Sequence, residues 1–458
     1  MSFDSPRYVL FLGAAVLLHR VCPRRLRWGL LLLLSLFFYA CWSPPLTLVI
    51  VGVIALTYLC GRMIGRAARP SARKCWVFLA AAGCLGLLVW FKYFEFLART
   101  VTEIAGGSWT PLHILLPVGC SFYTFQALSY VLDVYRGDLP AVRHPGHYAL
   151  YIAFFPQLVA GPIERAGALL PQLTEAKAAD KKQIVLGLKL LLTGFFRKLV
   201  IADLAAPAVN RVFAAARPDG SAVLISLALF AFQIYSDFAG YSDIARGSAL
   251  LLGVRLRRNF DRPYLARSFR AFWRRWHMSL TGWFTDYVYI PLGGSRKGAG
   301  RQILATMTVF LLSGLWHGAD WTFVCWGLLH GLLLSGEILL ARNRSREKPP
   351  LAYSFFCMGL IFLSWLLFRA ESLWQAGTML RCLFAPWDIQ GGLALTGLSM
   401  PQALCLGLGL CQLPLLHRVS EGRQVPDTAC LYLLACAVIA WFLRAESGNP
   451  GAFIYFQF

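Results

Sequence analysis

The chain has 458 residues, of which 58% are hydrophobic and 14% are charged, and its formal net charge is +22 at pH 7. Soluble domains contain roughly 45–50% apolar and about 25% charged residues, so this composition excludes a disordered chain, a collagen and an ordinary cytosolic enzyme. Because the apolar residues form long blocks, we predict an all-α polytopic membrane protein.

Apolar stretches along the chain predict about 11–13 transmembrane or re-entrant helices. Several are shorter than the roughly 20 residues of a simple span, and Gly, Pro or polar residues interrupt those at 112–133, 148–160 and 303–316. Irregular backbone at membrane depth survives only inside protein or beside a cavity, which indicates a thick helical body with a buried site. The candidate spans are 8–19, 28–40, 46–60, 76–97, 112–133, 148–160, 184–203, 221–238, 303–316, 321–341, 351–368, 397–416 and 428–444.

The positive charge is best interpreted as basic loops of a membrane protein. In a soluble protein it would suggest a nucleic-acid partner, which we do not expect here. The first two basic loops, at 20–27 and 62–74, are separated by the uncharged turn Cys41–Pro45. Because loops rich in Lys and Arg stay in the cytoplasm, we predict that the first basic loop is inside and the N-terminus outside.

The cysteines do not indicate a disulfide framework or a metal site. The 13 cysteines include no C-x-x-C pair, and most lie in apolar runs, where Cys behaves as a small hydrophobic residue. We therefore expect no metal.

Residues 255–275 are strongly basic, with eight Arg against the single acidic residue Asp261. Phe269, Phe272, Trp273 and Trp276 recur at helical spacing, which predicts an amphipathic interfacial helix on the cytoplasmic side. One interpretation is a membrane-surface anchor. The other is a docking face for a phosphate-bearing molecule, because the guanidinium group binds phosphate in a bidentate manner; that face is formed by Arg270, Arg274 and Arg275.

His317 follows a fully apolar run, and ionisable groups within membranes are functional candidates by default. Gly314, Trp316 and Gly318 flank it, and the small neighbours leave its ring accessible. It is either a neutral general base or a hydrogen-bonded core histidine. His330 lies 13 residues further on, a rise of about 20 Å and a rotation of about 220° on one helix. The two histidines can share a site only if the chain breaks between them, near Gly318 and Asp320.

Four more polar residues are candidates. His277 and Asp286 lie in a short amphipathic stretch that ends at Gly293 and Gly294 and reads as re-entrant. Asp237 and Asp243 bracket Gly240 six residues apart, which places them on different faces of a helix and disfavours a carboxylate dyad. They either cap a helix break or orient a catalytic imidazole or an Arg.

Together these motifs resemble the membrane-bound O-acyltransferases, and most closely their bacterial alginate O-acetyltransferase branch. The resemblance covers roughly residues 5–458. It is carried by SFYTFQALSYVLDVYRG (121–137), FFPQLVAGPIER (154–165), QIYSDFAGYSDIA (233–245), the block 259–298, LSGLWHGADW (312–321) and the terminal FIYFQF (453–458).

The resemblance implies a ring of tilted helices around a central funnel or tunnel, in a single domain over 1–458. It predicts N-terminal helices in 1–110, a catalytic core in 112–341 that includes the basic segment 255–298, and C-terminal helices and tail in 351–458. It also implies a multi-pass protein of the bacterial inner membrane. A cytoplasmic thioester, acetyl-CoA or an acyl carrier protein, would donate an acyl group that leaves toward the opposite side.

The near-invariant histidine of the family falls on His317, and its second polar position falls on His277. His330, Asp286, Asp237, Asp243 and Trp316 are expected to support them. The aromatic C-terminus either packs on the membrane interface or inserts in the tunnel, where the hydroxyl of Tyr455 would relay the acyl group.

The resemblance further implies an exported SGNH-type transferase or esterase as a partner, besides membrane lipid. The acyl group is expected to be acetyl, for an exported polysaccharide or cell-wall glycan. D-alanyl transfer to teichoic acid is an alternative, and a glycan or lipid transporter is the alternative of a different class.

Overall fold

The computed structural model describes residues 3–159, 161–341 and 349–446, and this part of the chain is helical, with no β-strand. It confirms the predicted all-α polytopic class. By length and composition, five of the described helices could cross a membrane, or six if the bent pair α19 (Ile389–Thr396) and α20 (Met400–Cys411) forms one span. Other predicted stretches correspond to shorter helices, such as α2 (Arg27–Ala40).

The chain forms two compact units, residues 1–191 with 244–257 and residues 192–243 with 258–458. Helices α10 (Lys181–Phe196) and α12 (Gly220–Leu251) contribute to both. The other elements of the first unit are α1 (Pro6–Val21), η1 (Arg24–Leu26), α2, α3 (Pro44–Arg66), α4 (Pro70–Leu88), η2 (Val89–Tyr93), α5 (Phe94–Ile104), α6 (Cys120–Arg136), α7 (Pro145–Ala153), α8 (Phe155–Leu158) and α9 (Ala166–Glu175).

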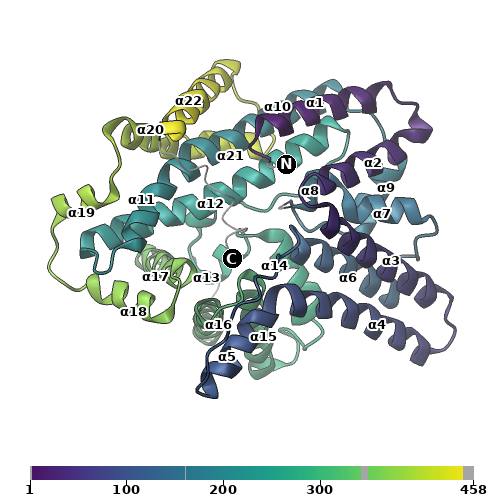
Figure 1. Ribbon diagram of the computed structural model, residues 1–458, viewed down its shortest axis with the longest axis horizontal. Helices are drawn as coiled ribbons and strands as arrows, with labels where there is room; N and C mark the ends of the chain where they lie inside the picture. Colours follow the sequence, from purple (N-terminus) through teal and green to yellow (C-terminus); the bar gives the residue numbers. More distant parts are fainter. Residues whose placement is uncertain (1–2, 160, 342–348, 447–458) are drawn as a thin grey trace. The chain divides into compact units, whose positions relative to one another are not determined.

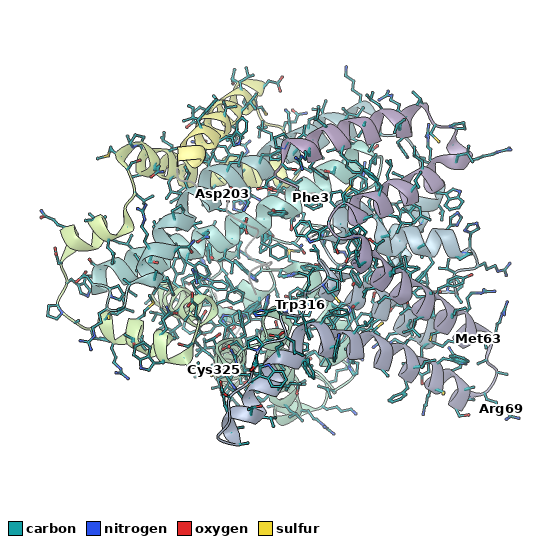
Figure 2. All side chains as sticks on the ribbon, in the orientation of Figure 1. Phe3, Met63, Arg69, Asp203, Trp316 and Cys325 are labelled. Atoms are coloured by element: carbon teal, nitrogen blue, oxygen red, sulfur yellow. The ribbon has the colours of Figure 1, made fainter. Side chains whose placement is uncertain are left out.

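Within the first unit, α3 packs on α4, α6 and α7, and α2 packs on α7 (Figure 1). The basic turn between α3 and α4 carries Arg69, labelled with Met63 in Figure 2. Glycines set the bounds of α6: Gly119 before it and Gly137 after it have φ of +72° and +86°, the left-handed region that glycine adopts without steric cost. Helix α6 therefore starts and stops where the sequence supplies that freedom.

The second unit holds the remaining elements. They are η3 (Arg197–Ala202), α11 (Asp203–Ala214), η4 (Pro263–Leu265), α13 (Phe269–Trp273), α14 (Met278–Phe284), η5 (Thr285–Tyr289), α15 (Gly298–His317), α16 (Trp321–Ala341), α17 (Leu351–Arg369), α18 (Leu373–Cys382), α19, α20, α21 (Leu413–Ser420) and α22 (Asp427–Glu446).

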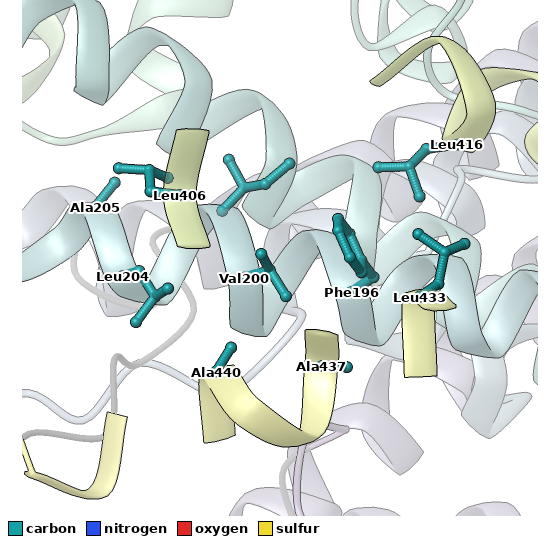
Figure 3. Close-up of a cluster of buried hydrophobic side chains, with 10 residues drawn as sticks. Phe196, Val200, Leu204, Ala205, Leu406, Leu416, Leu433, Ala437 and Ala440 are labelled. Atoms are coloured by element: carbon teal, nitrogen blue, oxygen red, sulfur yellow. The ribbon is translucent and has the colours of Figure 1, made fainter. Parts of the chain in front are cut away.

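An apolar cluster in the second unit joins the η3–α11 segment to the C-terminal helices (Figure 3). Phe196, Val200 and Leu204 follow one another at helical spacing and meet Leu406 of α20 and Leu433 of α22. Burial of side chains of this size stabilises the fold by about 1.5–3 kcal/mol each. The cluster fixes the helix that carries the neighbouring Arg197 and Lys198.

Helices α15 and α16 lie side by side (Figure 1) and share the most extensive contact of any two helices described. A Cβ atom on Gly314 would lie 3.3 Å from the Cα atom of Gly327 and would overlap the carbonyl oxygen of Phe323. The backbones thus touch because both helices carry glycine at the crossing. Figure 2 labels Trp316 near the end of α15 and Cys325 in α16.

The predicted amphipathic helix over 255–275 is wrong, because this segment forms only the three-residue 3-10 turn η4 and the five-residue helix α13. Before α13 the chain folds back on itself. Arg262 has a φ of +48°, and the backbone N–H of Asp261 donates to the carbonyl of Arg275 at 3.0 Å. The aromatic residues that suggested a surface stripe, Phe269, Phe272 and Trp276 among them, are buried.

Candidate functional site

The second unit contains a cavity of about 370 Å³ between α13, α14, α15 and α16. Its volume lies within the roughly 300–1,000 Å³ of small-molecule sites. Four residues singled out from the sequence line it: His277, His317, Arg270 and Arg274. Two imidazole rings and two arginine side chains therefore line the same cavity.

One face of α15 supplies polar side chains that sequence reasoning missed. Gln302, Thr306 and Ser313 line the cavity together with the predicted His317. Their spacing of four, seven and four residues keeps them on one side of a helix with 3.6 residues per turn. This polar stripe on a largely apolar helix was visible in the sequence and would have marked the face that bears His317.

His317 is the last residue of α15 and is 3% exposed. Its ring packs edge-on against Trp326 and Phe368, with centroids 5.2 and 5.3 Å away. The chain breaks after His317, and α16 begins at Trp321. The side chain of Asp320 accepts the N–H of Thr322 at 3.1 Å. The break required for His317 and His330 to approach one region is therefore present.

His277 adopts a left-handed conformation, with a φ of +43°, directly before α14. Its Nδ1 accepts the N–H of Leu280 at 3.4 Å, which leaves the proton of the neutral ring on Nε2. Burial lowers the pKa of His277 to about 3, because desolvation disfavours the charged form. The ring centroids of His277 and His317 are 6.4 Å apart, so a neutral donor ring lies beside the second imidazole.

His330 is fully buried but does not line the cavity. Its Nε2 is 2.9 Å from the hydroxyl of Ser364, and that hydroxyl donates to the carbonyl of Ile361 at 2.6 Å. Ser364 thus accepts from His330. The ring of His330 stands perpendicular to the cavity residue Trp273, with centroids 5.0 Å apart, so His330 supports the wall of the cavity.

The other candidates near the cavity do not line it. Trp316 packs on His277 and His317, with centroids 5.6 and 5.0 Å apart. Asp286 lies half-buried in η5, and Arg275 stands next to Arg274 without facing the cavity.

Asp237 and Asp243 form buried ion pairs. Lys198 Nζ lies 2.8 Å from Asp237 and 2.9 Å from Asp203. Arg197 lies 2.6 Å from Asp243. Helix α12 runs through Gly240 without a break, so helix capping is the wrong interpretation. Asp243 is paired with Arg197.

Arg197 and Lys198 were not predicted from the sequence, although two adjacent cations within the apolar stretch 184–203 were a visible signal. Ser420, on α21, also contacts Asp243, with oxygens 2.8 Å apart.

Tyr455 lies outside the described residues. Within the residues that the structure describes, no three His, Cys, Asp or Glu side chains are grouped so that they could hold a metal ion.

Comparison with known proteins assigns the class. Residues 144–374 match the model of the membrane-bound O-acyltransferase family. The chain is 34% identical to the probable alginate O-acetylase of Pseudomonas putida, and the match covers 100% of both chains. It is 34% identical to a peptidoglycan O-acetyltransferase of Helicobacter pylori, over 77% of this chain and 72% of that protein. A teichoic acid D-alanyltransferase of Streptococcus thermophilus is 27% identical over 51% of this chain and 61% of its own.

The chain thus belongs to the membrane-bound O-acyltransferase family. It is an O-acyltransferase and a multi-pass membrane protein.

Proposed function

We propose that this protein takes an acetyl group from a cytoplasmic thioester and passes it across the bacterial inner membrane for O-acetylation of an exported polysaccharide or cell-wall glycan. The observation that carries the proposal is the shared cavity of His277 and His317, whose rings are 6.4 Å apart. The acetyl group and a glycan acceptor are supported by the alginate and peptidoglycan acetyl-transferring relatives.

In this mechanism His317 acts as the general base. A hydroxyl group of the acceptor attacks the thioester carbonyl while the imidazole takes its proton. The carbonyl oxygen becomes an oxyanion, and the Nε2–H of His277 donates a hydrogen bond to it. When the tetrahedral intermediate collapses, the carbon–sulfur bond breaks, and the proton on His317 passes to the leaving thiolate. The ester and a free thiol are the products, and His317 returns to its neutral form.

The burial of both imidazole rings between apolar walls protects the thioester from hydrolysis. His277 and His317 are 1% and 3% exposed, so bulk water has little access to a bound thioester, which limits hydrolysis. Arg270 and Arg274 are suited to the phosphates of the donor. The donor is acetyl-CoA or an acyl carrier protein.

The N-terminus would lie outside, as the basic loops indicate. An exported SGNH-type transferase would complete the transfer to the glycan, and Tyr455 would be the hydroxyl that receives the acyl group first.

The decisive experiment is thioester turnover by the purified protein with radiolabelled acetyl-CoA. We expect thiol release by wild type and a loss of about 10²–10⁴-fold in a folded His317→Ala variant. Unchanged turnover in that variant would refute the assignment of the base. If wild type releases no thiol, the assay is repeated with an acetylated carrier protein and the exported partner, and continued inactivity would refute the acetyl donor.

D-alanyl transfer from a carrier protein is the second candidate, favoured by the likeness to the teichoic acid D-alanyltransferase. Turnover of a D-alanyl carrier in preference to acetyl thioesters would select it.

A further inference from the structure

A second cavity, of about 230 Å³, lies within the first unit and has no part in the proposed chemistry. It is formed by the first turns of α10, the last turns of α12 and the segment that follows α12. Its lining consists of Lys182, Gln183, Leu186, Arg246, Leu250, Arg255 and Leu256.

The lining of this cavity is divided between cations and leucines. Lys182, Arg246 and Arg255 are basic, and among the described lining residues none is acidic. Leu250 and Leu256 are 6% and 8% exposed. Two of these cations, Lys182 and Arg255, bring positive charge to the same small cavity, so an anion that lies between them would be bound favourably. The leucines favour an anion that also carries an apolar part.

The walls are held in place by backbone contacts. Helices α10 and α12 cross at two glycines, since a Cβ atom on Gly247 would lie 2.7 Å from the carbonyl oxygen of Gly187. Gln172 fixes the backbone of Arg255 from both sides: it accepts the N–H of Arg255 at 2.9 Å and donates to its carbonyl at 3.2 Å. Because the backbone of Arg255 is already fixed, only its side chain has to become ordered when an anion binds, which lowers the entropic cost at this residue.

Helix α10 carries no acidic residue, and the acid just before it caps the helix. Asp180 precedes the helix, and one of its carboxylate oxygens accepts the N–H of Gln183 at 2.7 Å. It caps the helix and does not line the cavity.

We propose that this cavity binds the phosphate headgroup of an anionic phospholipid, with the start of the acyl chains on its leucines. The cavity lies at the end of α12, a helix long and apolar enough to cross a membrane, and therefore near the headgroup layer. Basic pockets between transmembrane helices bind anionic headgroups in this way. The site is separate from the proposed acyl transfer and does not depend on it.

The test measures lipid binding to the purified full-length protein by native mass spectrometry. The probes are phosphatidylglycerol, phosphatidylcholine, inorganic phosphate and CoA. The test variant is Lys182→Gln/Arg255→Gln, and the matched control is Lys181→Gln, an exposed neighbour on the same turn that does not line the cavity. Arg255→Lys keeps the charge and serves as a second, milder variant.

We expect wild type to prefer phosphatidylglycerol to phosphatidylcholine. The double variant should bind phosphatidylglycerol roughly 30-fold more weakly, while Lys181→Gln and Arg255→Lys stay close to wild type. Equal binding by the double variant would overturn the proposal. So would inorganic phosphate binding as tightly as phosphatidylglycerol, since no lipid would then be recognised. CoA binding that is lost in the double variant, with lipid binding retained, would instead make this a donor site.

Discussion

At the scale of single residues, the structure separates two arginines that the sequence could not tell apart. Arg274 lines the cavity and Arg275 does not. We expect Arg274→Gln to raise the KM for acetyl-CoA about tenfold, with kcat nearly unchanged, because phosphates far from the carbonyl are bound equally in the ground and transition states. Arg275→Gln is the matched control, and steady-state kinetics on both variants is the measurement. Equal effects of the two substitutions would contradict the assignment.

Acid stability follows from the burial of His277. Its pKa is about 3 in the folded protein and about 6.5 in an unfolded chain. The unfolded state therefore binds a proton that the folded state excludes between these values. This titration leaves the free energy of unfolding at its full value above pH 6.5. The free energy of unfolding then falls as the pH drops, by about 2 kcal/mol at pH 5.

We expect His277→Gln to remove this part of the acid sensitivity, since Gln does not titrate. Thermal unfolding in detergent at pH 7.5 and pH 5 would measure it, with the exposed His113→Gln as the control. If the pH dependence of His277→Gln equals that of wild type, His277 is not buried in neutral form.

At the scale of elements, the sequence predicted the helix break beside His317 correctly but did not predict the local fold of residues 255–275. The break between His317 and Trp321 was expected from Gly318 and Asp320 and is present. The helix over 255–275 was not formed, because aromatic spacing cannot distinguish a surface stripe from rings buried in a folded-back loop. The roles of the site residues remain predictions.

The contact of α15 with α16 depends on the absence of Cβ atoms. A methyl group on Gly327 would overlap the carbonyl oxygen of Phe310. We expect Gly327→Ala to destabilise the protein by about 1–3 kcal/mol and to lower turnover, because the displaced α15 carries His317 at its end. Gly336→Ala is the control on the same helix, since a Cβ atom there would meet nothing within 4 Å. Thermal unfolding and turnover of both variants check the prediction. A stable and active Gly327→Ala protein would contradict it, because α15 and α16 would then separate at no cost.

At the scale of the whole chain, the second unit contains buried ion pairs of which the sequence revealed the acids but not their basic partners. The acids Asp237 and Asp243 were visible on a hydrophobic helix. Their partners Arg197 and Lys198 lie about 40 residues earlier, and a single sequence holds no signal that pairs residues so far apart. Burial forces the pairing, since an isolated charge in a low dielectric is very costly.

The ion pair of Arg197 and Asp243 yields a prediction with two arms. Both side chains are almost fully buried, at 2% and 4% exposed, and Ser420 brings α21 to the same carboxylate. Asp243→Leu leaves a buried cation without its partner and should cost about 3–5 kcal/mol. The double variant Arg197→Met/Asp243→Leu removes both charges and should recover most of that loss, because two desolvation penalties disappear together with the attraction. Thermal unfolding of wild type, Arg197→Met, Asp243→Leu and the double variant measures the coupling. If the double variant is as unstable as the two single losses added together, the pair does not act as one buried unit and its contribution lies in packing.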